Sequence, residues 1–553
     1  MKKLLALLIA ALMAFGATAC ANNNSGAAAT NPPAAAPAQE ATKAPDSAPA
    51  APAAEAASGG HLKYTISAID ADKAGTMNED GSLSGDLAWL YDKFDFEFEF
   101  FPLTWDNYID QTRMWLASNE APDLLMLDVA AVRYTEFVNN VQDGMFRPYT
   151  GYENYPNLKA KMDNASAGKK FIVDGELYAW PGFIDTEMYD YRVLNGACIR
   201  KDWAQAVGLY QEDRLYTWDE LLAMIRAVLD QDPGGNGPGN TIGMLGVDWQ
   251  FPKYFGPGNL SPYMLQYGPD GQGGYTWGPL LPESLEVVKM TKQLYDEGLI
   301  WPDEVMVKAE DPGNKLNANQ LFCRIWQNIS AGGLSGGKRS YYEANPDSVP
   351  DDLLDWVLFS GPDGKVLTYQ SNDHWSQEAM NANLSDEKAT RWMEILDYLV
   401  SDEGYYFRTL GIPEVDWTYV DGVATANWTT LNDDGSLKKP YDNTWAWARA
   451  AGASDNADLS APYTSQATKD NMYQLYDYIL DDSITKSIDV DVALNFFTGE
   501  QYSAVGTMES DIYQEVQMLM LSNDVEKDWN SWLDSKRPLV EPAIAELNAA
   551  LKK

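Results

Sequence analysis

The chain has 553 residues, of which 45% are hydrophobic and 12% aromatic, so it can bury a large globular core. Its 81 acidic residues outnumber its 40 basic residues, which gives a formal net charge of −41. This charge argues against nucleic acid and anionic lipid as partners and favours a neutral or cationic ligand. The same acidity keeps a surface protein soluble, so the charge alone does not select the ligand.

The N-terminus has the pattern of an export signal that ends at a cysteine. Two lysines precede an apolar run at residues 4–16, and three small residues then lead to Cys20. We expect a signal peptide at residues 1–19. Cys20 at the first mature position resembles the lipobox of bacterial lipoproteins, whose thiol is acylated, although Ala17 replaces the usual leucine. Lipidation of Cys20 and anchoring at the extracytoplasmic face of the cell membrane are predicted, and an ordinary secretory signal is the alternative.

Residues 20–60 form a predicted tether. They are rich in Ala, Pro, Asn, Ser and Gly and carry almost no large apolar side chain. Such a segment buries too little surface to offset its ordering entropy, so we expect it to be disordered and, because of its prolines, semi-extended. The folded part is predicted to begin at residue 61.

Strands and helices alternate in the first folded unit. Their order predicts a mainly parallel sheet covered by helices, with ligands bound at the carboxyl ends of the strands. Asp70 and Asp128 lie at two such ends. The hydrophobic periodicity predicts a strand at 62–69, a helix at 81–94, a strand at 96–100, a helix at 108–117 and a strand at 124–128.

A second α/β unit follows a predicted strand at 195–200. Thr217 and Glu220 have the spacing of a capping box, with Thr at the N-cap and Glu at N3 of a helix. Further helices are predicted at 283–297, 386–401 and 469–480.

Few cysteines and histidines are available for chemistry. Apart from Cys20, only Cys198 and Cys323 occur, and the sequence leaves open whether they pair or stay free. His61 lies at the tether boundary, which leaves His374 for any triad or His-based metal site. Such sites are therefore hard to build.

Several segments, taken in order, resemble the extracellular solute-binding proteins of ABC importers. The similarity is greatest to the large lipoprotein members associated with oligosaccharide uptake, and it fades after Trp417. The segments that carry it are 119–128 (NEAPDLLMLD), 173–181 (VDGELYAWP), 198–203 (CIRKDW), 216–221 (YTWDEL), 294–300 (LYDEGLI), 401–404 (SDEG) and 411–417 (GIPEVDW).

The resemblance implies an α/β protein of two lobes, the type II periplasmic-binding-protein fold, with a hinge that closes the lobes on a ligand in the cleft. By analogy the chain crosses between the lobes near residues 181–191 and 357–361 and once more after Ser401. The first lobe is expected to comprise residues 61–185 with 356–405, and the second lobe residues 186–355 with 406–553.

The resemblance also places four tryptophans at the cleft edge or the hinge. Sugars present flat C–H faces to aromatic rings and hydroxyl groups to carboxylates and amides, so this set suits a neutral oligosaccharide. For any single tryptophan, packing in the core is the alternative. The expected ligand-binding residues are Trp180, Trp326, Trp375 and Trp417, with Phe183, Asp185, Glu187 and Asn328 beside them and Asp128 facing them from the other lobe.

Residues 232–240 resemble the calcium loop of alginate-type binding proteins and, loosely, an EF-hand loop. Gly234 and Gly243 occupy its third and twelfth positions, so few oxygen donors remain. A glycine-rich turn without the ion is the alternative, and no other cofactor is expected. The possible calcium ligands are Asp232, Asn236, Pro238 and Asn240.

The predicted function is that of a membrane-anchored solute-binding protein that captures an oligosaccharide and delivers it to the permease subunits of an ABC importer. It is expected to act as a monomer, to contact the membrane only through its lipid, and to bind no nucleic acid. A cell-surface glycoside hydrolase is one alternative, but acid pairs such as Asp351 and Asp352 are usually solvated. A peptide-binding lipoprotein of similar size is the other.

Overall fold

The computed structural model shows an α/β protein with two separate sheets, and the residues it describes above 60 fall within one compact unit of the chain. The expected signal peptide, Cys20 and nearly all of the expected tether lie outside the described residues, as do Asp70, Glu187 and Asn328. The described residues are 60–69, 83–104, 107–129, 134–185, 192–245, 267–303, 311–327, 329–348, 353–370, 373–431, 437–441, 446–454, 459, 461–488, 492–506 and 509–551.

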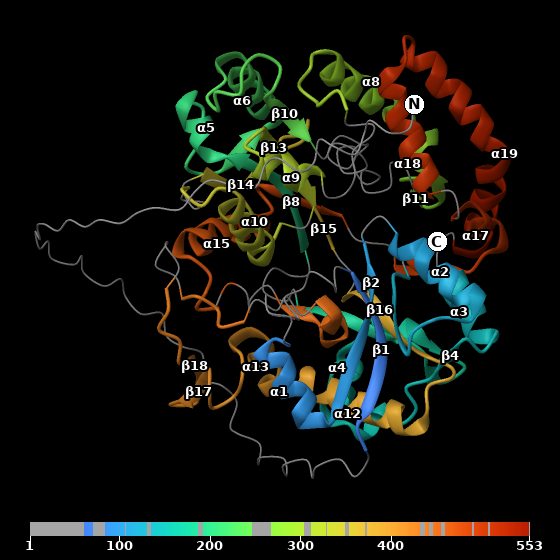
Figure 1. Ribbon diagram of the computed structural model, residues 1–553. Coiled ribbons are helices and arrows are strands. Elements are labelled where there is room, and N and C mark those ends of the chain that lie inside the picture. Colours follow the sequence, from blue (N-terminus) through green and yellow to red (C-terminus); the bar gives the residue numbers. More distant parts are fainter. Residues whose placement is uncertain are drawn as a thin grey trace, which may run out of the picture. The chain divides into compact units, whose positions relative to one another are not determined.

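The first sheet has the strand order β19-β7-β16-β3-β1-β2, with β4 paired to β16. Strands β1, β2 and β3 are parallel, which confirms the prediction for this part, whereas β16 runs antiparallel to both β3 and β7. The sheet is therefore mixed. Figure 1 labels β1, β2 and β16 of this sheet. Its strands are β1 (Leu62–Ile69), β2 (Phe96–Leu103), β3 (Leu124–Leu127), β4 (Phe146–Arg147), β7 (Trp180–Asp185), β16 (His374–Asn381) and β19 (Ala453–Ser454).

Helices pack their apolar faces against this sheet and enclose one core, in which Tyr64, Phe96 and Trp392 are fully buried. We call the sheet and these helices the first lobe. Its helices are α1 (Gly85–Phe94), α2 (Tyr108–Ser118), α3 (Tyr134–Gln142), α4 (Pro156–Asn164), α12 (Asp386–Leu399) and α13 (Asp402–Leu410), with short 3-10 turns η2 (Tyr152–Asn154), η3 (Ala167–Phe171) and η8 (Ala446–Ala451).

The second sheet has the order β10-β13-β8-β14-β9, and β15 pairs with both β8 and β20. The long strand β8 runs antiparallel to β13, β14 and β15. The strands are β8 (Arg192–Arg200), β9 (Leu215–Thr217), β10 (Ile242–Leu245), β13 (Leu321–Gln327), β14 (Leu354–Ser360), β15 (Val366–Gln370) and β20 (Thr485–Ile488).

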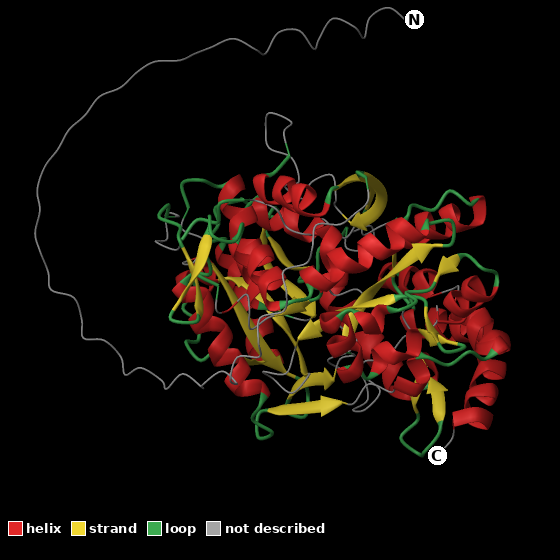
Figure 2. Ribbon diagram, turned by 90° about the horizontal axis from the view of Figure 1, so that it is seen from below, coloured by secondary structure: helices red, strands yellow, loops and turns green. Residues whose placement is uncertain are grey.

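Helices also pack around the second sheet, and Figure 2 shows helices gathered about the strands. We call this sheet and its helices the second lobe. The capping box is confirmed, because Thr217 accepts a hydrogen bond from the Glu220 amide and Glu220 from the Thr217 amide. The helices are α5 (Lys201–Ala206), α6 (Trp218–Gln231), α8 (Pro282–Asp296), α9 (Asp311–Asn317), α10 (Ala331–Ala344), α15 (Gln466–Ile479), α16 (Val492–Asn495), α17 (Glu500–Gly506), α18 (Glu509–Met518) and α19 (Val525–Leu551).

Three small hairpins and two 3-10 turns complete the described elements. None of the described helices is long and apolar enough to cross a membrane. These remaining elements are β5 (Ile172–Val173) with β6 (Glu176–Leu177), β11 (Tyr267–Pro269) with β12 (Tyr275–Trp277), β17 (Trp417–Val420) with β18 (Val423–Ala426), η6 (Gly278–Leu280) and η9 (Leu519–Leu521).

The chain passes between the two sheets at three places: from β7 to β8, from β15 to β16 and from β19 to β20. The first passage joins β7 to β8, within the range expected for it. The expected second passage at 357–361 is wrong, because β14 stays paired to β8 and β9 of the second sheet, and the chain crosses only between β15 and β16. The expected boundary at 405/406 is also wrong, since Phe407 lies in the core of the first lobe and β19 pairs with β7.

The two buried cysteines are free. They lie on neighbouring antiparallel strands, where Cys198 is opposite Arg324 and Cys323 is opposite Ile199. Because side chains alternate across a sheet, the two thiols point to opposite faces and pack in different apolar clusters. Burial raises the pKa of both thiols, that of Cys198 to about 12.

Candidate ligand-binding site

An aromatic group lies at the carboxyl ends of the parallel strands in the first lobe. Strands β1 and β2 end in the buried residues Ile69 and Leu103, and Met126 is buried near the end of β3. Three half-buried rings pack against this small cluster. We call them the aromatic platform: Tyr108, Trp115 and Trp375.

Asp128 joins this platform to the sheet. It follows β3 directly and is half-buried, and the Tyr108 hydroxyl donates a hydrogen bond to Asp128 Oδ2 over 2.8 Å. Tyr108 is the first residue of α2, so the bond fixes the start of this helix against the end of β3. The expected position of Asp128 at the ligand-binding edge of the sheet therefore agrees with the strand order.

Trp375 reaches the platform from a distorted part of β16. The pairing of β16 with β7 shifts register between His374 and Gln377, and Ser376 has a φ of 56°. A bulge of this kind changes the direction in which neighbouring side chains point, and bulges are common next to functional sites. Gln377 then returns to the sheet, where its Oε1 accepts a hydrogen bond from the Val129 amide.

The charges near the platform are largely compensated. Arg113 on α2 donates to both carboxylate oxygens of Glu136 over 2.9–3.1 Å, and Glu136 raises the pKa of Arg113. Asp110 lies within 3.6 Å of the same guanidinium group. The Asp128 carboxylate, in turn, accepts the hydrogen bond from the Tyr108 hydroxyl of the platform.

Three of the expected site residues are core residues instead. Trp180 is 0% exposed, its indole N–H donates to the Ala450 carbonyl over 2.9 Å, and its ring packs edge-on against Phe183, which is also buried. Trp417 is 2% exposed, and its N–H donates to the Gly411 carbonyl over 2.9 Å. Because each indole is enclosed and has its donor bonded within the protein, these side chains stabilise the fold.

For two further expected site residues, Asp185 and Trp326, the structure gives the strand pairing of the backbone. Asp185 at the end of β7 pairs in register with Ser454, and Trp326 in β13 pairs with Gly196. Of the expected set, the structure thus brings Asp128 and Trp375 together. The pattern of the sequence missed Tyr108 and Trp115. Both lie on the helix that follows β2, and the rule that ligands bind at strand ends contained the signal needed to find them.

The residues of the loop at 232–240 do not fit a calcium ion. The Asp232 carboxylate accepts hydrogen bonds from the amides of Asn236 and Gly237 and from the Thr241 hydroxyl. A side chain at Gly234 would overlap the ring of Trp203, so no donor can be added at the third position.

The twelfth position is closed as well. A Cβ at Gly243 would lie 2.7 Å from the Leu299 carbonyl oxygen. The Asn236 side-chain amide donates to the Asn319 carbonyl over 3.0 Å, and that of Asn240 to the Asn236 carbonyl over 2.9 Å. Across the described residues, no group of three or more His, Cys, Asp or Glu side chains could hold a metal. Hydrogen bonds within the protein, rather than a calcium ion, therefore hold this loop in its turn conformation.

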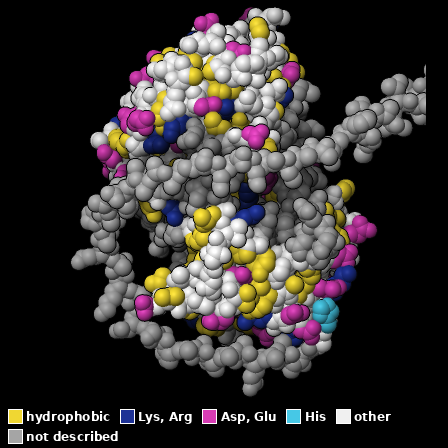
Figure 3. All heavy atoms as spheres, turned by 60° about the vertical axis from the view of Figure 1, so that its left-hand side comes forward, with side chains coloured by type: hydrophobic (Ala, Val, Ile, Leu, Met, Phe, Trp, Pro, Cys, Tyr) yellow, Lys and Arg dark blue, Asp and Glu magenta, His cyan; other side chains and the backbone are white. Residues whose placement is uncertain are grey.

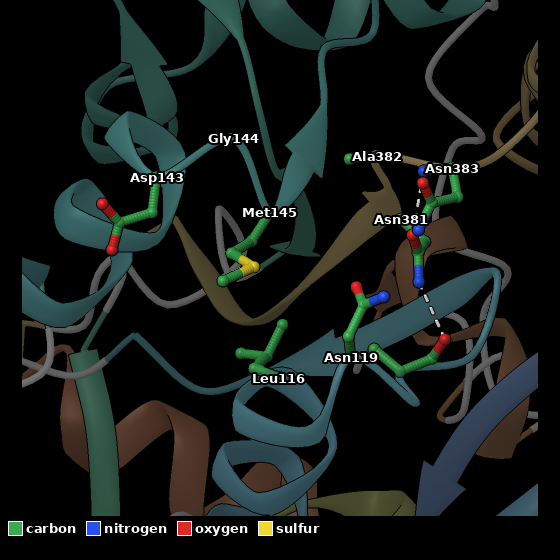
Figure 4. Close-up of a pocket in the computed structure, with 9 residues that line it drawn as sticks. Leu116, Asn119, Asp143, Gly144, Met145, Asn381, Ala382 and Asn383 are labelled. Carbon is green, nitrogen blue, oxygen red and sulfur yellow. Dashed lines mark hydrogen bonds between the residues drawn. The ribbon is translucent and has the colours of Figure 1, made fainter.

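A polar pocket of about 210 Å³ lies elsewhere on the first lobe (Figure 4). It is lined by Asn119 at the end of α2, by Asp143 after α3 and by Asn381 at the end of β16. The Asn381 amide donates to the Ala121 carbonyl over 2.7 Å. Since β16 is antiparallel to β3, this pocket lies at the amino end of β3, at the opposite edge of the sheet from Asp128.

The surface reflects the acidic composition. Figure 3 shows acidic side chains at many separate places on one face of the molecule, with basic side chains between them. The excess negative charge is therefore dispersed over this face, as is typical of a soluble surface.

Comparisons with known proteins place these observations in context. No protein-family model matches the chain. It is 28% identical over 346 residues to the Lipoprotein LipO of Bacillus subtilis (strain 168), a match that covers 59% of this chain and 62% of the relative. It is 27% identical over 316 residues to the fructooligosaccharide ABC transporter substrate-binding protein FusA of Streptococcus pneumoniae, covering 53% of this chain and 54% of that one.

A third relative is the polygalacturonan/rhamnogalacturonan-binding protein YtcQ of Bacillus subtilis, which is 24% identical over 314 residues, with 56% of this chain and 58% of YtcQ covered. The chain thus spans less than two thirds of the length of the curated relatives it matches.

Solved structures extend the likeness to most of the chain. A crystal structure of the alginate-binding protein AlgQ2 without calcium ion matches with a TM-score of 0.64 and 15% identity, covering 89% of this chain and 98% of that one. The structure of Streptococcus pneumoniae FusA with kestose matches with a TM-score of 0.59 and 16% identity, covering 88% and 98%. The chain therefore has the two-lobed fold of solute-binding proteins, and its sequence relatives include ABC-transporter substrate-binding proteins.

Proposed function

We propose that the chain is the solute-binding component of an ABC importer and that it captures a neutral oligosaccharide on the aromatic platform. The observation that carries this proposal is the grouping of Tyr108, Trp115 and Trp375 around Asp128 at the carboxyl ends of the first sheet. Rings bind the C–H faces of sugars, and a carboxylate accepts hydrogen bonds from their hydroxyl groups. The names of the fructooligosaccharide ABC transporter substrate-binding protein FusA and the polygalacturonan/rhamnogalacturonan-binding protein YtcQ support a carbohydrate ligand.

The rings of the platform can supply part of the free energy needed to bind an oligosaccharide. A micromolar dissociation constant corresponds to about −8 kcal/mol. Two or three ring contacts contribute roughly 0.5–1.5 kcal/mol each beyond the area they bury, and hydrogen bonds in a closed site add to them. Contacts made by the second lobe would then favour the form in which both lobes touch the ligand, which is a population shift.

Anchoring completes the proposed role. The export signal and Cys20 support a lipid anchor at the extracytoplasmic face of the membrane, and the name of the lipoprotein LipO is consistent with it. A sugar bound by the anchored protein would then be available to the permease subunits. The known relatives are binding proteins, and we propose that this chain, too, releases its ligand unchanged.

A thermal-shift experiment on the mature full-length protein tests the proposal. The probes are a neutral fructo-oligosaccharide and other neutral glycans, an oligogalacturonate and a basic peptide. A ligand that binds only the native state raises the melting temperature, so we expect a rise with at least one neutral oligosaccharide and no new reducing ends in a parallel assay. A rise with the peptide alone would favour a peptide-binding lipoprotein, and release of reducing ends would favour a glycoside hydrolase; either result overturns the proposal.

A further inference from the structure

Two adjacent phenylalanines pack against different lobes. Phe496 and Phe497 follow the short helix α16 and precede α17, and both are half-buried. Phe496 packs against the core of the first lobe, whereas Phe497 packs against the core of the second. Such a pair makes a contact between the lobes that is separate from the three places where the chain crosses.

The ring of Phe496 lies among aromatic side chains of the first lobe. It is edge-on to Tyr134, with ring centroids 5.0 Å apart, and edge-on to Phe171 at 5.9 Å. The ring of His374 is 6.5 Å away. His374 is the first residue of β16, directly after the second crossing, and its Nδ1 lies 2.7 Å from Asp373 Oδ1. Phe496 therefore contacts the first lobe beside one of the crossing strands.

The neighbouring residues hold Phe497 firmly on the second lobe. The ring of Phe497 is edge-on to Tyr502 at 5.5 Å. The carboxylate of Glu546 on α19 accepts hydrogen bonds of 2.9 Å from the amides of Glu500 and Tyr502 at the start of α17. A Cβ at Gly499 would overlap Glu546 Oε2 and the Phe497 ring, so a side chain here would have to displace them.

A polar contact lies close to the aromatic one. Thr135 of α3 and Ser503 of α17 share a hydrogen bond of 2.6 Å between their hydroxyl groups. Thr135 is adjacent to Tyr134, so one short segment of the first lobe meets one short segment of the second through both rings and hydroxyls.

We propose that the segment from Phe496 to Ser503 is a clasp that links the two lobes without a covalent crossing and restricts their separation when no ligand is bound. Separation of the lobes at this point requires Phe496 to leave the ring set formed by Tyr134, Phe171 and His374. A contact of this kind biases a hinge equilibrium toward the form in which the lobes touch. This inference rests on the proposed function only in that opening and closing would accompany ligand exchange.

Small-angle scattering of the ligand-free, full-length mature protein tests the clasp. We expect Phe496→Ala to increase the radius of gyration, because loss of one ring pair shifts such an equilibrium by roughly two- to tenfold. Tyr134→Ala is expected to act in the same direction, and the double variant Y134A/F496A to add little to either single change, since both substitutions break the same contact. Phe496→Leu keeps an apolar side chain at this position, so its radius of gyration should lie between those of the wild type and Phe496→Ala.

An exposed tyrosine on the second lobe provides the matched control. Tyr473 on α15 is 48% exposed, so Tyr473→Ala should leave the radius of gyration unchanged. If Phe496→Ala scatters like the wild type while circular dichroism shows both folded, the clasp does not restrict separation and the inference is wrong. Because no ligand is present, this result is independent of whether an oligosaccharide raises the melting temperature.

Discussion

Tyr108 and Asp128 are joined by a 2.8 Å hydrogen bond that connects the first residue of α2 to the end of β3. Three strand ends, one helix start and two tryptophans meet around this bond. The parallel arrangement of β1, β2 and β3 explains the meeting, because their carboxyl ends share one edge of the sheet. The proposed binding site on this edge is therefore where the order of the strands leads us to expect it.

Removal of the Tyr108 hydroxyl should weaken ligand binding without unfolding the protein. In Tyr108→Phe the ring remains, but Asp128 loses the hydrogen bond from the Tyr108 hydroxyl. A hydrogen bond to a charged carboxylate contributes about 1.5–3 kcal/mol, so we expect a loss of oligosaccharide affinity of roughly tenfold or more by isothermal titration calorimetry. Tyr473→Phe, on an exposed helical position, serves as the control. If Y108F and the wild type bind the oligosaccharide with equal affinity, this hydrogen bond does not contribute to ligand binding.

Substitution of Trp180 should affect stability and leave affinity unchanged. Trp180→Phe loses buried volume and the hydrogen bond to the Ala450 carbonyl, which should lower the free energy of unfolding by about 1–3 kcal/mol. Urea denaturation measures this change, and titration of the folded variant should give the wild-type affinity. If Trp180→Phe loses much of its affinity for the oligosaccharide while its free energy of unfolding is unchanged, Trp180 belongs to the binding site after all.

Glu378 should make the first lobe less stable as the pH rises. Its carboxyl group is 6% exposed and accepts hydrogen bonds from the Trp392 indole and the Tyr149 hydroxyl, and burial raises its pKa from 4.5 to about 8. Because the folded state holds this proton more tightly, the stabilisation is complete below about pH 4.5 and is lost as the pH rises toward 8.

The slope contributed by Glu378 is at most about 1.4 kcal/mol per pH unit between these limits. Glu378→Gln keeps the shape and cannot ionise, so its free energy of unfolding should vary less between pH 5 and pH 8 than that of the wild type. Glu153→Gln, at an exposed position, should retain the wild-type slope. The assignment fails if E378Q and wild type show parallel pH profiles.

Calcium should have no effect on the loop at 232–240. Since Thr241, Asn236 and Gly237 already donate to Asp232, we expect the same melting temperature in excess EDTA and in excess calcium chloride. Thr241→Val removes one of these bonds and should lower the free energy of unfolding by about 1 kcal/mol in both solutions. A melting temperature that rises with calcium and falls with EDTA would contradict this reading of the loop.

Local sequence patterns predicted the secondary structure well where periodicity and capping were strong. The strand at 62–69 and the capping box of Thr217 and Glu220 are present as predicted, because both depend on neighbours in the chain. The passage between β15 and β16 was misplaced, since nothing in the local sequence indicates that β14 pairs on both sides within the second sheet.

The tryptophans show a similar limit. Trp180 and Trp417 are buried and Trp375 is half-buried, and this difference depends on residues far away in the sequence. The carbonyl that accepts from Trp180 belongs to Ala450, 270 positions later. Trp375 is half-exposed because it lies next to a bulge in β16, and a bulge is set by the pairing of strands.

The role of Trp375 is tested most directly by isothermal titration of wild type and Trp375→Ala with the neutral oligosaccharide that gives the largest thermal shift. The half-buried indole is expected to stack on the sugar, so its removal should reduce the affinity by at least about tenfold while the variant stays folded. An oligosaccharide that binds both proteins with equal affinity would contradict the assignment of this edge of the first sheet as the place where the ligand is held.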